Sequence, residues 1–226
     1  MVRKKTTLNQ NIQVAIDAVI FAVRGGELNV LLIEMKKSPF VGRWALPGGL
    51  ISDHETTLAA AERILREETG VTGVYLEQLM TFDELKRDPA GRVVSVAWFA
   101  LLPDGELELH TSEKYAGVEW RPISRAKNLA YDHNKILQAA VDRLRAKLGY
   151  TNMVWSLLPT KFSLTELQTV YEIILDRELD KRNFRKKILA AGLLKATGSQ
   201  RIIGAHRPAA LYSFKTKKLI VTNIIS

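Results

Sequence analysis

The chain has 226 residues, a net charge of +9 and a hydrophobic fraction of 46%, so it can form one large or two modest folded domains. It contains no cysteine, which excludes disulfides, thiolate nucleophiles and cysteine-ligated zinc or iron–sulfur centres. It has no apolar run of about 18 residues and no apolar core near its start. We therefore expect a soluble, cytoplasmic protein without a membrane segment or a signal peptide.

The excess of positive charge lies in the last third of the chain. Residues 160–226 contain 13 Lys and Arg against 5 Asp and Glu, a net +8, whereas residues 1–159 contain 20 against 19, a net +1. This asymmetry favours a module that binds nucleic acid, joined to a neutral domain. The alternative is a basic tail that only aids solubility.

Apolar, β-branched segments alternate with helical segments over the first 149 residues. Strands are predicted over 12–23, 28–34, 74–85, 92–102 and 115–121, and helices near 122–129 and over 132–148. Gly25 and Gly26 predict a hairpin turn between the first two strands. With a further helix after the second strand, these elements fit an α/β/α sandwich.

Residues 47–71 predict a tight loop followed by that further helix. The Pro-Gly-Gly turn at 47–49 lets backbone approach a ligand closely. Ser52, with Glu55 three residues later, fits a capping box, so the helix is predicted to begin there. Gly70 stands where a helix ends in the left-handed conformation.

This segment resembles the Nudix box. The matching residues are Gly49, Glu55, Arg63, Leu65, Glu67, Glu68, Gly70 and Val71. Ile64 stands where the family has a glutamate, on the helix face that it shares with Glu67 and Glu68. In the family, carboxylates on this face hold magnesium against a pyrophosphate. The resemblance implies a pyrophosphate-binding domain with absent or vestigial hydrolysis, no catalytic residue and no magnesium site. The alternative is that Glu67 and Glu68 only form a solvated face of the helix.

The resemblance implies a Nudix-like α/β/α domain over residues 1–149. Residues 150–159 are predicted to be a short linker that is packed, because Trp155, Leu157 and Leu158 are too apolar to remain in water. Residues 160–226 are predicted to form a second domain.

The second domain has the pattern of a winged helix. Ser163 and Glu166 fit a capping box at the start of one helix, and Asp180 predicts the N-cap of a second helix that Gly192 ends. The core-facing residues of the second helix are predicted to be Phe184, Ile188 and Leu189. A basic, glycine-rich loop and two strands, predicted over 210–214 and 219–225, complete the pattern.

In a helix-turn-helix the second helix enters the major groove of DNA. The DNA-binding candidates on that helix and on the wing are Lys181, Arg182, Asn183, Arg185, Lys186, Arg201, His206 and Arg207. Arginine pairs with guanine, asparagine pairs with adenine, and arginine and lysine also contact phosphates. A solvated basic face is the alternative for the helix, and an ordinary surface histidine is the alternative for His206.

A degenerate Nudix box before this winged helix resembles the Nudix-related, NrtR-like transcriptional regulators, over nearly the whole chain. The resemblance implies a homodimer that controls NAD metabolism or a related pathway, binds a palindromic DNA operator and senses ADP-ribose or a similar metabolite, with no cofactor required. The implied effector neighbourhood is Arg43, Trp44, Gly48, Gly49, Glu67, Glu68, Arg87 and Asp88. Ala90 stands where an arginine would be expected, which leaves the effector open.

Two other functions stay open: an active pyrophosphohydrolase with a basic accessory domain, and an RNA-binding Nudix protein. The short, apolar linker predicts that effector binding changes the orientation of the DNA-binding domains and therefore DNA affinity.

Overall fold

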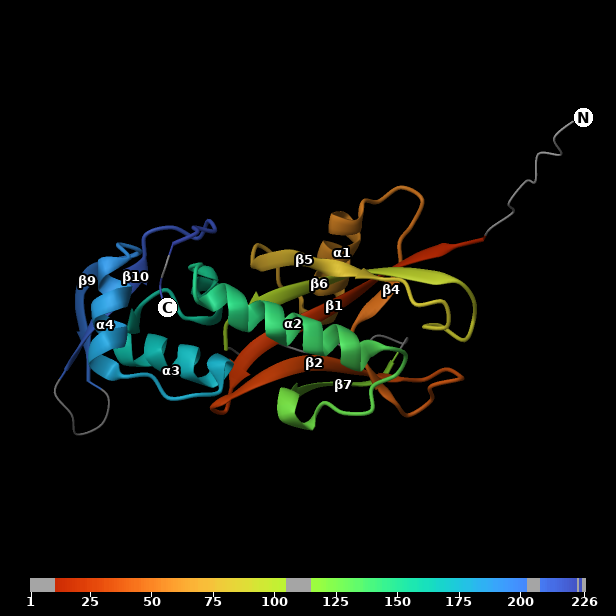
Figure 1. Ribbon diagram of the computed structural model, residues 1–226, viewed down its shortest axis with the longest axis horizontal. Helices are drawn as coiled ribbons and strands as arrows, with labels where there is room; N and C mark the ends of the chain where they lie inside the picture. Colours follow the sequence, from red (N-terminus) through yellow and green to blue (C-terminus); the bar gives the residue numbers. More distant parts are fainter. Residues whose placement is uncertain (1–10, 105–114, 203–207, 223, 225–226) are drawn as a thin grey trace, which may run out of the picture.

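The computed structural model describes residues 11–104, 115–202, 208–222 and 224. The first part of the chain contains β1 (Gln13–Arg24), β2 (Glu27–Met35), β3 (Trp44–Ala45), β4 (Gly48–Leu50), α1 (Thr57–Thr69), β5 (Tyr75–Phe82), β6 (Val93–Leu102), β7 (Tyr115–Pro122), η1 (Ile123–Arg125), α2 (His133–Leu148) and η2 (Met153–Leu157). The second part contains β8 (Phe162–Ser163), α3 (Leu164–Leu175), α4 (Lys181–Ala190), β9 (Leu194–Arg201) and β10 (Ala209–Phe214). The two parts lie side by side (Figure 1).

The central sheet is organised around β1. Its path is β3-β2-β1-β6-β5, with β4 paired to β1 and β7 paired to β2. β1 runs parallel to β6 and antiparallel to β2 and β4. β1 is the central strand, and its two faces pack in two different apolar clusters, which explains the continuous apolar run of its sequence.

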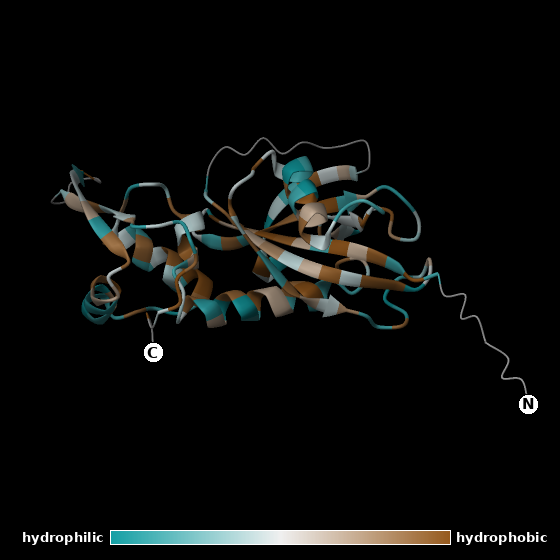
Figure 2. Cartoon of the chain, turned by 90° about the horizontal axis from the view of Figure 1, so that it is seen from above, coloured by the Kyte–Doolittle hydropathy of each residue, from teal (hydrophilic) through white to brown (hydrophobic). Residues whose placement is uncertain are grey.

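The two faces of the sheet are covered by different helices (Figure 1). Ile16 and Ile20 of β1 pack on the α1 side with Ala60 of that helix. Val19 and Phe21, which alternate with them, pack on the α2 side. Figure 2 shows apolar residues along these central strands. The predicted α/β/α sandwich is confirmed.

The second part of the chain is a winged helix, as predicted. α3 packs on a small sheet of order β8-β10-β9, and α4 packs on α3. Ser163 Oγ accepts the Glu166 backbone N–H at 3.1 Å, and the Glu166 carboxylate accepts the Ser163 N–H at 2.7 Å, so both halves of the predicted capping box form. The Asp180 side chain caps α4, also as predicted.

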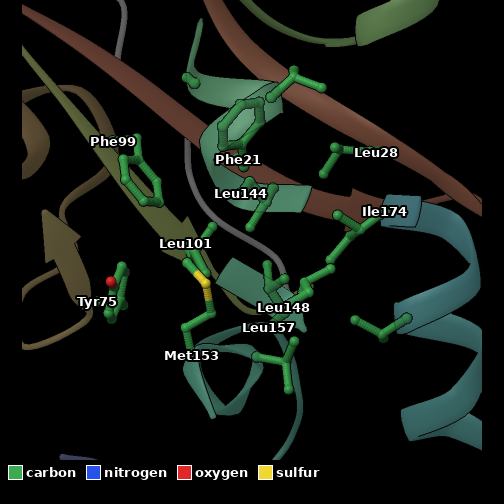
Figure 3. Packing of buried hydrophobic residues seen from close by; sticks show 14 of the residues in the cluster. Phe21, Leu28, Tyr75, Phe99, Leu101, Leu144, Leu148, Met153, Leu157 and Ile174 are labelled. Carbon is green, nitrogen blue, oxygen red and sulfur yellow. The ribbon is translucent and has the colours of Figure 1, made fainter. Parts of the chain in front are cut away.

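The segment between the two parts is packed, as its apolar sequence predicted. Met153 and Leu157 of η2 are buried against residues of the sheet and of α2 (Figure 3). Ile174 of α3 belongs to the same apolar cluster (Figure 3). The core is therefore continuous from the sandwich into the winged helix.

Helix α1 begins later than predicted. Thr56, not Ser52, is its N-cap, and the Thr56 hydroxyl accepts the Ala59 backbone N–H at 3.2 Å. Only the backward half of the predicted capping box forms, from the Ser52 N–H to Glu55 at 2.9 Å. The Glu55 carboxylate also accepts two hydrogen bonds from Arg63 of α1, and these hold residues 52–55 as a loop over the helix.

Three further expectations were wrong. The helix predicted near 122–129 is only the short η1, because the backbone leaves the helical conformation at Ala126, where ψ is 75°, and is left-handed at Asn128. The strand predicted over 219–225 is absent from the described residues of that segment; Val221 forms an isolated bridge to Thr151, and Asn152 hydrogen-bonds the backbone of Ile220. Leu189, predicted to face the core, is 46% exposed.

Candidate functional site

The Pro-Gly-Gly turn forms the rim of a cavity of about 190 Å³ in the sandwich. The lining residues are Ala15, Asp17, Ile33, Met35, Ala45, Leu46, Gly48, Gly49, Leu50, Arg87, Asp88, Val93, Tyr115, Tyr131 and His133. Gly48 pairs with Asp17 across β4 and β1, and a Cβ at Gly48 would lie 2.7 Å from the carbonyl oxygen of Ile16. Glycine is therefore required at position 48, because any side chain would clash with β1 where the two backbones approach each other at the cavity.

A buried charge cluster forms one wall of the cavity. The Arg87 guanidinium lies 2.9 Å from Asp17 Oδ2 and 2.7 Å from Asp132 Oδ1, and all three side chains are less than a tenth exposed. Ser95 Oγ donates to Asp17 Oδ2 at 2.6 Å. Burial raises the pKa of the Asp17 carboxyl, but His133, the Ser95 hydroxyl and Arg87 outweigh it and hold that pKa at about 2. The carboxylate is therefore ionised at neutral pH.

The proton on His133 is fixed by its neighbours. The Leu46 backbone N–H donates to His133 Nδ1 at 2.9 Å, so this nitrogen carries no proton. The other nitrogen, Nε2, lies 3.3 Å from Asp17 Oδ1 and carries the proton that faces the carboxylate. The Pro-Gly-Gly loop, β1 and the start of α2 are therefore tied together at this histidine.

Four predicted effector residues, Gly48, Gly49, Arg87 and Asp88, line the cavity. Arg87 is already committed to two carboxylates, so its guanidinium forms the wall and is not a free phosphate ligand. Asp88 accepts the Ala90 backbone N–H at 2.8 Å, which shapes the loop between β5 and β6.

Arg43 and Trp44 lie outside the lining and shape the loop before α2. Arg43 Nη2 donates to the carbonyl oxygens of Asn128 and Leu129, both at 2.9 Å, and the Trp44 carbonyl accepts the Ala130 N–H at 2.8 Å. The loop holds Asn128 and Tyr131 in left-handed backbone, at φ 55° and 51°. Such strain is stable only where surrounding contacts enforce it, and it is common at binding sites.

Helix α1 carries two of the three carboxylates that the Nudix box places on one helix face. Ile64 is 3% exposed and packs in the core between α1 and the sheet. Glu67 pairs with Arg63 at 3.6 Å, and Glu68 is buried and hydrogen-bonds Tyr115 of the cavity wall. The described residues hold no cluster of three or more His, Asp or Glu placed for a metal. The residues present do not fit the magnesium that the Nudix box implies, because an apolar side chain replaces one of three hard oxygen ligands.

Four cavity residues with titratable side chains were not predicted from the sequence: Asp17, His133, Tyr115 and Tyr131. Asp17 had a usable signal, since it is the one charged residue inside the apolar run of 12–23. The other three had none, because they approach the cavity from the ends of β7 and α2, far along the chain.

The candidate DNA-binding face lies on α4. Lys181, Arg182, Asn183 and Lys186 are exposed, whereas Phe184 and Ile188 of the same helix are buried. The predicted candidates on this helix therefore lie on its solvent side. Arg185 is the exception, because it is half-buried and donates to Thr165 Oγ1 at 3.1 Å.

The predicted wing residues differ in position. Arg201 ends β9 and pairs with Glu166 at 2.8 Å, while also donating to the Lys161 carbonyl. This arginine ties the wing to the capping box of α3. His206 and Arg207 lie outside the described residues.

A Nudix-type sandwich joined to a winged helix defines the class of protein: a DNA-binding regulator with a domain that binds a small molecule. The NUDIX domain model matches residues 12–140, and the model of the NrtR DNA-binding winged helix domain matches residues 154–214. The chain belongs to the family of NrtR transcriptional regulators.

Known proteins of two kinds are similar to this chain. The ADPR responsive transcriptional repressor NtrR of Acinetobacter baylyi is 40% identical over 88% of this chain and 80% of its own length. The ADP-ribose pyrophosphatase of Methanocaldococcus jannaschii is 34% identical over 65% of this chain and 81% of its own length.

The crystal structure of Shewanella oneidensis NrtR with a 27mer DNA is 34% identical, with a TM-score of 0.80, and the match covers 89% of this chain and 93% of that one. The NUDIX domain of the same protein, in a cocrystal with ADP ribose, is 32% identical with a TM-score of 0.55, over 60% and 90% of the two chains. Among the helices that the structure describes, none is long and apolar enough to cross a membrane.

Proposed function

We propose that this protein is a transcriptional repressor that binds an operator through its winged helix and ADP-ribose in its Nudix domain. The observation that carries the proposal is the pairing of two features: an exposed basic face on α4, and a cavity at Gly48 and Gly49 beside a helix with Ile64 in place of a carboxylate. The repressor from Acinetobacter and the two Shewanella structures support both halves.

The proposed oligomer is a homodimer. One winged helix contacts few base pairs, and each mismatch changes binding by only about 1–3 kcal/mol. Two copies related by a twofold axis would bind a palindrome whose half-sites are about 10 base pairs apart, or a multiple of that. Light scattering on the purified chain tests this, and a monomer at the concentrations that bind DNA refutes it.

The proposed route between the two sites is helix α2. Its first residue, His133, lies at the cavity wall, and near its other end Arg145 Nε donates to the Ile174 carbonyl of α3 at 2.8 Å. Asp176, which follows α3 in left-handed backbone, lies 3.8 Å from Arg145 Nη2. Effector contacts with the start of α2 would therefore shift the position of α3 relative to the sandwich, in addition to any change in the linker.

Operator binding is tested by titrating the full chain, at constant salt, into a duplex obtained by in vitro selection. ADP-ribose at saturation is expected to weaken binding about 5- to 150-fold, the usual range of coupling between sites. An unchanged dissociation constant refutes effector control. Arg145→Ala is expected to bind DNA and ADP-ribose but to lose part of the coupling.

The DNA-binding face is tested with charge-matched variants. Arg182→Ala is expected to relax sequence preference, and Lys186→Ala to weaken all sequences alike and reduce the salt slope by about 1. Arg125→Ala removes an equally exposed arginine of the sandwich and is expected to leave DNA binding unchanged. Equal effects of the Arg182 and Arg125 variants would refute the assignment of α4.

Absence of hydrolysis is the second part of the proposal. In an assay with ADP-ribose as substrate and magnesium present, we expect AMP to be released on the order of a thousandfold or more slowly than by an active Nudix enzyme. The reason is that one metal-binding carboxylate is absent. A turnover near 1 per second would support the alternative, a pyrophosphohydrolase with a basic accessory domain. Ile64→Glu is expected to lower stability and not to restore hydrolysis, since Ile64 lies in the core.

The regulated genes are proposed to belong to NAD metabolism or a related pathway, as the family resemblance implies. Sequencing the genomic fragments that the purified protein retains tests this.

A further inference from the structure

An apolar side chain, Leu189, lies on the exposed face of α4. Leu189 is 46% exposed, whereas Phe184 and Ile188 fill the core side of the same helix. An exposed leucine in the last turn of a basic helix contributes little to folding. Several other large apolar side chains are exposed in the described residues, and what distinguishes Leu189 is its place on the basic face of α4.

Leu189 continues the line of the basic candidates. Arg182, Lys186 and Leu189 are related by helical spacings of four and three residues, so they share one side of α4. The same spacing pattern carries the base-reading side chains of the homeodomain recognition helix. Figure 1 places α4 at the end of the molecule that is far from the sandwich.

A leucine side chain is apolar, so on a base edge it can make a favourable contact only with an apolar group. In the major groove the C5-methyl group of thymine is the apolar feature, and alkyl side chains contact it. Arginine and lysine on the same side would hold the phosphates and guanine edges around it.

We propose that Leu189 is a specificity-determining residue that contacts a thymine methyl group in each operator half-site; this rests on the proposed function of DNA binding. Arg182 and Leu189 are separated by about 10 Å along the helix axis, at 1.5 Å per residue. Base pairs are stacked about 3.4 Å apart. The thymine is therefore expected within about three base pairs of the base that Arg182 contacts, three being the limit for an α4 axis parallel to the duplex.

The experiment uses the full chain and the duplex that in vitro selection yields. Each thymine is replaced in turn by deoxyuridine, which lacks only the methyl group. For the wild type, one position per half-site is expected to bind about three- to tenfold more weakly as deoxyuridine. Leu189→Ala is expected to bind both duplexes equally, and Leu189→Met to retain the difference because it retains an apolar contact.

The control is Leu58→Ala in α1, because Leu58 is a helical leucine with a similar exposed fraction, 45%, and lies outside the winged helix. It is expected to retain the wild-type difference. The proposal is overturned if Leu189→Ala discriminates deoxyuridine as the wild type does, or if no thymine responds. A uniform loss of affinity together with a change in mass by light scattering would instead place Leu189 in a contact between two copies, which also overturns it. If selection yields no preferred duplex, the proposed function itself fails.

Discussion

Arg87 is the residue whose replacement tests the cavity wall most directly. Its side chain is 3% exposed and lies between Asp17 and Asp132, which are 8% and 7% exposed. Arg87→Ala removes the guanidinium and leaves two buried carboxylates. Asp17 keeps His133 and Ser95 as partners, whereas the hydrogen bonds described for the Asp132 carboxylate all come from Arg87.

The expected cost follows from that geometry. Removing one partner of a buried ion pair costs about 3–5 kcal/mol, because the remaining charge is left in a poorly solvated place. We expect about 3 kcal/mol for Arg87→Ala, since Asp17 keeps two of its partners. Arg87→Lys keeps the charge but not the planar fork that spans both carboxylates, so an intermediate loss is expected.

The assay is urea denaturation followed by tryptophan fluorescence at neutral pH. At a slope near 3 kcal/mol per molar, the midpoint for Arg87→Ala should fall by about 1 M. The control is Lys135→Ala, which breaks the pair of Lys135 with Glu84, whose side chains are 60% and 64% exposed. That variant should change stability by less than about 1 kcal/mol. Equal midpoints for the two variants would refute the reasoning.

Three further outcomes are expected. Asp17 has a pKa of about 2 in the folded protein against an ordinary value of 3.8, so its ionised form stabilises the fold above about pH 4, and this stability is lost as pH falls toward 2. The difference in free energy of unfolding between wild type and Asp17→Asn should therefore shrink by about 2 kcal/mol over that range, and a constant difference would contradict it. Ser163→Ala should cost about 1 kcal/mol in urea denaturation through loss of the α3 cap, while Ser163→Thr keeps most of it; equal loss in both variants would exclude a capping role. Arg43→Ala should weaken ADP-ribose binding in calorimetry by releasing the strained loop that carries Tyr131, and Arg43→Lys should not restore it, because one ammonium is poorly shaped to hold both carbonyls; full rescue by lysine would argue that charge alone matters.

The sequence by itself determined the fold class and most of the longer elements. Apolar β-branched runs predicted the central strands, because a strand that is buried on both faces has apolar residues at successive positions. Capping residues such as Ser163 and Asp180 predicted helix starts correctly, because a cap depends on neighbours within three residues. The fixed spacing around Ile64 predicted the Nudix-type domain and its missing carboxylate, and the basic end of the chain predicted a DNA-binding domain.

Tertiary structure alone decided which groups the long polar side chains contact and which apolar side chains remain exposed. Arg43 and Arg87 looked like ligand contacts in sequence, yet their guanidinium groups are held by carbonyls and carboxylates more than 40 positions away in the chain. Leu189 fitted the helical core pattern but faces solvent, since the width of the buried stripe is set by what packs against the helix. Asp17 and His133 meet only because β1 and the start of α2 border one cavity. A local pattern fixes backbone conformation, but the partner of a side chain depends on which distant segments the fold brings beside it.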